Sequence, residues 1–231
     1  DRLRTVPAMS GHRRWRSSLL RTPANAPFRH WLRDRSSLTA RIQARGRFTV
    51  RVLRQSLGMP TADEALALGM VPGTRAWIRE VALLGDDQIV VFAHTVLPRR
   101  PRGPLLVWLA RLGNRSLGAL LFAHPGFSRG AMHFKALDRR HALFAPAIDA
   151  LQLTKRPPDT LCARRSHFGF GAQSVLVSEV FSPRLLQLGA VDSATHAKRD
   201  GQRPSPERPA EGQERSRGLD FQRRKDHRDT K

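Results

Sequence analysis

The sequence has one cysteine, Cys162, no tyrosine, and no lysine before Lys135. A single cysteine excludes an internal disulfide and offers no cysteine-based metal site. No apolar run approaches the roughly 18 residues that a membrane-spanning helix needs. We therefore expect a soluble cytoplasmic protein of a reducing compartment, without a membrane span.

Acidic residues are also scarce. The chain has 19 Asp and Glu and 41 Lys and Arg, which gives a formal net charge of +22. The excess is almost entirely arginine, as in proteins from GC-rich genomes, and it is scattered along the chain. No helix-turn-helix, zinc-finger or aromatic-rich RNA-binding motif accompanies it. A nucleic-acid-binding protein remains an alternative supported by charge alone, and we expect no specific nucleic-acid partner. The charge favours the approach of an anionic metabolite.

The 231 residues suffice for one domain of ordinary size. Residues 1–26 are basic and contain proline and serine. We interpret them as a flexible N-terminal extension, with a transit peptide as the alternative. Residues 189–231 are rich in charge, glycine and proline and nearly lack large apolar side chains, which predicts a disordered tail. The folded domain is then 27–188.

Hydrophobic periodicity within this domain predicts an α+β protein. Strands are expected at 48–54, 76–84, 88–97, 128–137, 162–170 and 174–181. Helices are expected at 28–32, 38–43, 63–68, 105–112, 116–122 and 147–153. Gly85-Asp86-Asp87 is typical of the turn of an antiparallel hairpin, and Ser36 or Ser37 can cap the second helix. Two pairs of these helices form helical hairpins, around 31–45 and 105–122.

The strand at 76–84 carries a charge in the middle of an apolar face. Arg79 shares that face with Trp77, Val81 and Leu83, because alternate side chains of a strand point the same way. A buried guanidinium is unfavourable unless it is paired. Arg79 should therefore meet a protein carboxylate or an anionic ligand; the alternative is that it reaches water at a sheet edge.

The last strand repeats this pattern with the opposite charge. Glu179 shares a face with Val175, Val177 and Phe181. Burial disfavours its charged form unless a cation or donor compensates. A structural Arg79–Glu179 ion pair and a glutamate that reaches water are the simpler alternatives. Together the two residues predict a polar pocket for a small anion.

Four segments resemble the chorismate pyruvate-lyase family, in its order and near its spacing: WIREVALL (Trp77–Leu84), RLGNRSLGALLF (Arg111–Phe122), ARRSHF (Ala163–Phe168) and VLVSEVFSP (Val175–Pro183). The resemblance covers about Phe28–Leu185. It implies a single antiparallel sheet of about six strands, with two helical hairpin flaps over a buried site. The connector Asp138–Thr160 is longer than the family pattern, and the tail lies beyond it.

The resemblance implies an activity. Members of this family are carbon–oxygen lyases that convert chorismate to 4-hydroxybenzoate and pyruvate in the first committed step of ubiquinone biosynthesis. It implies no cofactor and no metal, and we expect a monomer. The alternative is a ligand-sensing effector-type module with the same fold and no catalysis.

The family pattern also implies site residues. Arg79 would bind the ring carboxylate, for which a guanidinium is well shaped. Glu179 would face the oxygen that becomes the phenol hydroxyl, as a general acid if protonated or as an acceptor if ionised. Leu38, where the family has methionine, and Leu117 would form apolar walls. Arg129 is a candidate for binding the enolpyruvyl carboxylate, with an exposed strand-end arginine as the alternative.

Overall fold

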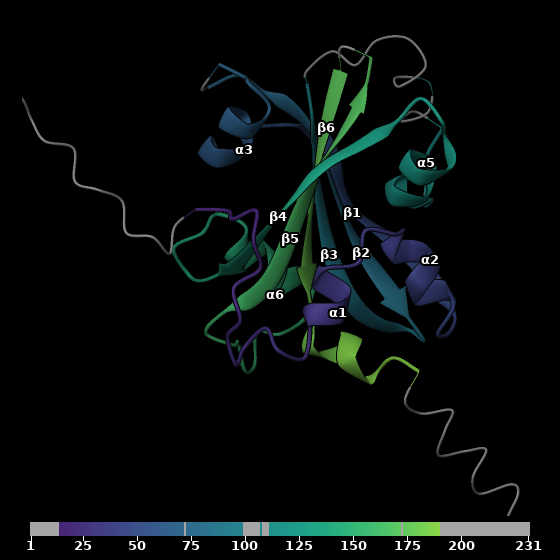
Figure 1. Ribbon diagram of the computed structural model, residues 1–231, viewed down its shortest axis with the longest axis vertical. Helices are drawn as coiled ribbons and strands as arrows, with labels where there is room; N and C mark the ends of the chain where they lie inside the picture. Colours follow the sequence, from purple (N-terminus) through teal and green to yellow (C-terminus); the bar gives the residue numbers. More distant parts are fainter. Residues whose placement is uncertain (1–13, 72, 99–106, 108–110, 172, 190–231) are drawn as a thin grey trace, which may run out of the picture.

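A six-stranded antiparallel sheet, in the order β1-β2-β3-β6-β5-β4, forms the centre of the molecule (Figure 1). The computed structural model describes residues 14–71, 73–98, 107, 111–171 and 173–189. Its strands are β1 (Phe48–Gly58), β2 (Ala76–Gly85), β3 (Gln88–Leu97), β4 (Ser128–Leu137), β5 (Leu161–Phe170) and β6 (Gln173–Phe181). The expected α+β fold with a single sheet is therefore confirmed.

Short helices cover both faces of the sheet. They are α1 (Arg29–Leu32), α2 (Leu38–Gln43), α3 (Ala62–Ala67), α5 (Leu117–Ala123), α6 (Phe144–Ala150) and the 3-10 helix η1 (Pro183–Gln187). Figure 1 shows α1, α2 and α5 on one side of the sheet and α3 and α6 on the other. The helix expected at 105–112 falls mainly outside the described residues. The second helical hairpin is therefore described only in α5 and the turn before it.

Side-chain caps fix where the helices near the sheet begin. Ser37 accepts a hydrogen bond from the backbone N–H of Ala40, and Ser116 accepts one from that of Ala119. Such caps satisfy N–H groups that have no partner in the first turn. Because Ser37 and Ser116 are the caps, Leu38 and Leu117 become the first residues of α2 and α5.

The central hairpin forms where it was expected, with a two-residue turn, because Gly85 belongs to β2 and only Asp86 and Asp87 connect the strands. Asp86 and Asp87 have φ angles of 48° and 62°. Positive φ at both positions is typical of a type I′ turn, whose twist matches that of the strands. β1 continues to Gly58, beyond the expected end at Arg54, because a register shift between Val52 and Arg54 interrupts the alternation on which that prediction depended.

The sheet is buried on both faces. On one face α1 and α2 pack against the middle of β2, β3 and β6. The residues of this cluster include Trp31, Leu32, Ile42, Val81, Leu83 and Phe181. On the other face α6 packs against the same strands and β5, in a cluster that includes Phe92, Phe144, Ile148, Leu151 and Val180. This double burial makes β3 almost continuously apolar.

The N-terminal segment differs from the expected flexible extension. Arg16 forms an isolated β-bridge with Phe134 on the edge strand β4, with N···O distances of 3.0 and 2.8 Å. The Trp15 indole N–H donates to Asp63 at 2.7 Å. Residues 14–26 therefore contact the domain; their basic composition did not reveal this because backbone pairing leaves no hydrophobic pattern. Residues 1–13, and the tail expected to be disordered from 190 on, lie outside the described residues.

Candidate active site

The register of four neighbouring strands places the predicted charges close together. Residues directly opposite one another on β2, β3, β6 and β5 form a row: Arg79, Thr95, Val177 and Ser166. The next row on the same face is Val81, Ala93, Glu179 and Arg164. Arg79 and Glu179, which are far apart in sequence, therefore lie in adjacent rows.

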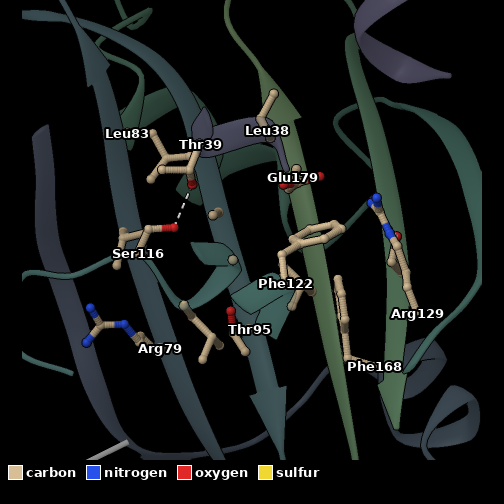
Figure 2. Close-up of a pocket in the computed structure, with 16 residues that line it drawn as sticks. Leu38, Thr39, Arg79, Leu83, Thr95, Ser116, Phe122, Arg129, Phe168 and Glu179 are labelled. Carbon is tan, nitrogen blue, oxygen red and sulfur yellow. Dashed lines mark hydrogen bonds between the residues drawn. The ribbon is translucent and has the colours of Figure 1, made fainter. Parts of the chain in front are cut away.

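A pocket lies between these rows and the two helices above them (Figure 2). Its cavity volume is about 30 Å³. All four site residues expected from the sequence line it, namely Arg79, Glu179, Leu38 and Leu117. One small cavity therefore collects residues from β2, β6, α2 and α5.

Arg79 is a buried cation without a carboxylate counter-ion among the described residues. Its side chain donates to the Gln55 side chain, to the Gly113 carbonyl oxygen at 2.7 Å and to the Arg115 carbonyl oxygen at 3.2 Å. No carboxylate of the described residues lies within ion-pair distance of it. Burial lowers the pKa of Arg79 from its ordinary value. With the residue only 2% exposed, the alternative that Arg79 reaches water at a sheet edge is wrong.

Glu179 is paired, but with a residue that the sequence interpretation missed. Its Oε2 accepts from Nε of Arg164 at 2.5 Å, so the simple Arg79–Glu179 ion pair is not formed. Arg164 also donates from Nη1 to the carbonyl oxygens of Trp31 at 2.7 Å and Asp34 at 2.6 Å. Arg164 has the same sequence signal as Arg79. It is a charged residue between Cys162 and Ser166 on a largely apolar face of its strand.

Arg129 lies at the pocket and is half-buried, so the alternative of an exposed strand-end arginine is wrong. Its Nε and Nη2 donate to Ser166 Oγ at 3.1 and 2.9 Å, and its Nη1 donates to the Arg35 carbonyl oxygen at 2.6 Å. The guanidinium carbon lies 5.2 Å from the ring centre of Phe122 and 5.5 Å from that of Phe168. Burial is the largest cause that lowers the pKa of Arg129, to about 10.

A hydroxyl pair joins the two helices that cover the pocket. Thr39 Oγ1, in α2, and Ser116 Oγ, the cap of α5, are 2.7 Å apart (Figure 2). Both residues are buried. We call residues 29–43 the first flap and residues 113–123 the second flap. The sequence interpretation missed this contact because small hydroxyl residues far apart in the chain leave no periodic signal.

The charges of the pocket are unbalanced in favour of cations. Three arginines, Arg79, Arg129 and Arg164, line or adjoin it, and Glu179 is the carboxylate among its lining residues. Phe122 and Phe168 add aromatic walls. A concave site with a net positive charge, apolar walls and few polar groups suits a small anionic ring compound.

No described helix is long and apolar enough to cross a membrane.

Comparison with known sequences shows a family relationship. The sequence model of the family "Chorismate lyase" matches residues 14–189. The "Probable chorismate pyruvate-lyase" of Dechloromonas aromatica (strain RCB) is 45% identical over 176 residues, which cover 76% of this chain and 97% of that protein. The protein of the same name from Aromatoleum aromaticum is 46% identical over 169 residues, covering 73% and 90%.

Among solved structures, a similar one is the C-terminal domain of the histidine utilization repressor from Pseudomonas syringae pv. tomato. Its TM-score is 0.46 and its sequence identity 15%, over 59% of this chain and 92% of that one. The family match spans the described sheet and every residue of the pocket. This chain belongs to the chorismate lyase family.

Proposed function

We propose that this protein converts chorismate to 4-hydroxybenzoate and pyruvate, in the first committed step of ubiquinone biosynthesis. The observation that carries the proposal is the meeting of Arg79, Glu179, Leu38 and Leu117 at one buried pocket in a chain of the chorismate lyase family. These residues come from four different elements, so their meeting at one pocket depends on the whole fold and would not arise by chance.

Arg79 binds the ring carboxylate in this proposal. Its charge has no protein counter-ion among the described residues, so an incoming carboxylate would supply the missing partner. A charge-assisted hydrogen bond is strong in such a buried place, because little water competes for it. The bonds to the Gly113 and Arg115 carbonyl oxygens orient the guanidinium before the ligand arrives.

Arg129 binds the second carboxylate, that of the enolpyruvyl group. Figure 2 shows Arg79 and Arg129 on opposite sides of the pocket. Chorismate is a dianion with one carboxylate on the ring and another on the side chain, so a cation on each side matches its charges. Phe122 and Phe168 lie beside Arg129 and would exclude water from this end.

The reaction needs orientation more than a strong catalyst. The ether bond between ring and side chain breaks, and its electron pair leaves on the enolpyruvyl oxygen. The adjacent ring carbon, which carries the hydroxyl, loses its hydrogen as a proton, and the ring becomes aromatic. The enolpyruvate gains a proton and becomes pyruvate. Aromatisation supplies driving force, so binding the substrate in a reactive conformation is a large part of what the protein must do.

Glu179 acts as a hydrogen-bond acceptor for the ring hydroxyl in this proposal. Its Oε2 already accepts from Arg164, which can only donate. Of the two roles left open by the sequence, orientation of the hydroxyl is therefore favoured over proton donation to the ether oxygen.

The flaps control access to the pocket in this proposal. Residues of both flaps line the pocket, among them Leu38, Thr39, Ser116 and Leu117. The Thr39–Ser116 hydrogen bond joins the flaps over the pocket. Opening at this contact would admit the substrate, and closing would exclude water.

The test is to incubate the purified protein with chorismate, without added metal, and to measure 4-hydroxybenzoate and pyruvate. We expect both products in equal amounts. A folded protein that binds chorismate or 4-hydroxybenzoate but releases no pyruvate would instead be a ligand-sensing module. A folded protein that neither binds nor converts chorismate would contradict the proposal.

A further inference from the structure

Arg164 connects the proposed acceptor Glu179 to the first flap. The arginine is 1% exposed and lies directly opposite Glu179 in the β5–β6 register. Its Nε donates to Glu179, and its Nη1 donates to the carbonyl oxygens of Trp31 and Asp34. These carbonyls belong to α1 and to the connector between α1 and α2, so one side chain contacts both the site and its cover.

A buried guanidinium is strongly unfavourable unless its N–H groups find acceptors. The first flap supplies two of the acceptors seen here. If the flap moved away, Nη1 would lose both acceptors. The Glu179 carboxylate cannot replace them while it stays bonded to Nε, because Nη1 and Nε point in different directions on the planar guanidinium. The guanidinium would therefore turn toward new acceptors, and the carboxylate bonded to Nε would lose its orientation toward the substrate.

We propose that Arg164 is a positioning residue for the lyase reaction. Its side chain holds the Glu179 carboxylate toward the pocket only while the first flap is closed on Arg164. The flap position and the orientation of the acceptor are then coupled by a single side chain. Arg164 does not touch the substrate. Its effect on turnover passes through Glu179.

Arg165 provides a matched control on the same strand. It points to the opposite face of β5, donates to Asp63 at 2.9 Å and lies over the ring of Trp15 at 4.6 Å. Like Arg164, it is an arginine with little exposure and a carboxylate partner. It contacts neither flap among the described interactions, so its removal tests the general effect of losing a partly buried arginine–carboxylate ion pair.

The first experiment is a double-mutant cycle on kcat and KM for chorismate. Arg164→Met should lower kcat by no more than the factor that Glu179→Gln causes, because its effect passes through Glu179, and affinity for 4-hydroxybenzoate should fall together with kcat. In the Glu179→Gln background, Arg164→Met should cause little further loss, because the two residues act as a unit. Arg164→Lys, which keeps the charge but not the planar fork, should fall between. Arg165→Met should leave kcat near the wild-type value in both backgrounds.

Losses from Arg164→Met and Glu179→Gln that multiply would overturn the inference, as would equal effects of Arg164→Met and Arg165→Met. If Arg164→Met fails to fold, the paired Arg164→Met/Glu179→Gln variant removes both charges at once. The kcat of this double variant is then compared with that of Glu179→Gln alone. The kcat of Arg164→Lys is compared with that of the wild type. Equal kcat in the first comparison and a lower kcat for the lysine variant support the inference; any other combination overturns it.

The second experiment does not need turnover. Amide hydrogen exchange of residues 31–37 should be faster in Arg164→Met than in the wild type, and unchanged in Arg165→Met. This inference rests on the proposed function, but the two fail separately. A wild-type protein that does not convert chorismate refutes the function, whereas unchanged exchange in the flap of a folded Arg164 variant refutes the coupling.

Discussion

At the residue scale, the charged side chains of the site differ in whether a partner of opposite charge lies beside them. Glu179 has a guanidinium partner in Arg164, whereas Arg79 has carbonyl and amide oxygens but no carboxylate among the described residues. An uncompensated buried cation destabilises the empty protein and favours an anionic ligand. This difference separates a residue that binds the substrate from one that supports the site.

Replacement of Arg79 tests that distinction. Arg79→Ala should abolish useful turnover, because the loss of a charge-assisted contact to a carboxylate weakens binding by about 2–5 kcal/mol. The protein should still fold, since the removed charge lacks an ion-pair partner among the described residues, but the lost hydrogen bonds to the Gly113 and Arg115 carbonyl oxygens should loosen the beginning of the second flap. Arg75→Ala, at an exposed position just before the same strand, is the control and should behave as the wild type. Normal turnover and normal affinity for 4-hydroxybenzoate in Arg79→Ala would show that the assignment is wrong.

The Glu179 side chain is tested by the pH dependence of the reaction. If it accepts a hydrogen bond, Glu179→Gln should lower turnover and product affinity modestly and together, and kcat should not decline from pH 6 to pH 9 in either form. A general acid would behave differently: kcat would fall as pH rises, glutamine would remove that fall, and turnover would drop by about 10²- to 10⁴-fold. Measurement of kcat and product affinity for both forms across this range separates the two roles.

At the scale of elements, the site depends on short helices that polar contacts fasten to a rigid sheet. Arg79 holds the beginning of the second flap, and Arg129 and Arg164 hold the connector of the first. On the opposite face α3 is attached in a similar way, because Glu64 and Glu80 flank the buried His94 at 3.3 and 3.0 Å. Elements of six or seven residues are too short to be stable alone, so these contacts determine where they lie.

The contact between the flaps can be removed selectively. Thr39→Val keeps the shape of the side chain but removes the hydrogen bond to Ser116. We expect a loss of about 0.5–1.5 kcal/mol in the free energy of unfolding and faster amide exchange in α5. Thr49→Val, at an exposed position on β1, is the control and should alter neither. Unchanged exchange in α5 of the Thr39 variant would show that the hydroxyl pair does not hold the flaps together.

The attachment of α3 predicts a pH dependence of stability. Burial alone would lower the pKa of His94, but hydrogen bonds and charges of Glu64 and Glu80 outweigh it and raise this pKa from 6.5 to about 9. Because the pKa is higher in the folded state, the stabilisation is complete below about pH 6.5 and is lost as pH rises through about 9. A shift of this size corresponds to about 3 kcal/mol at full effect.

Thermal unfolding between pH 6 and 10 measures that loss. The midpoint should fall over the range in the wild type and fall less in His94→Gln. His124→Gln, at a histidine on the other side of the sheet, is the control and should keep the wild-type dependence. A wild-type midpoint that stays constant up to pH 10 would contradict the assignment of His94 as a charged link.

At the scale of the whole molecule, the strands and the central pocket were predictable from the sequence. Strand alternation places Arg79 and Glu179 among apolar residues, and the family resemblance adds Leu38 and Leu117; all four line the pocket. What the sequence does not reveal depends on contacts between distant segments. Arg164 has the same alternation signal as Arg79, but its pairing with Glu179 is known only from the structure. The Thr39–Ser116 pair depends on the meeting of two helices, and the contacts of residues 14–26 depend on backbone pairing to an edge strand.

A crystal structure of the protein with 4-hydroxybenzoate tests the central claim most directly, because it locates the product relative to the residues assigned here. We predict the product between Leu38 and Leu117, with its carboxylate within hydrogen-bond distance of Arg79 and its hydroxyl donating to Glu179. The Arg164–Glu179 contact should persist in that complex. A product bound outside this pocket, or bound with its carboxylate at Glu179, would contradict the account.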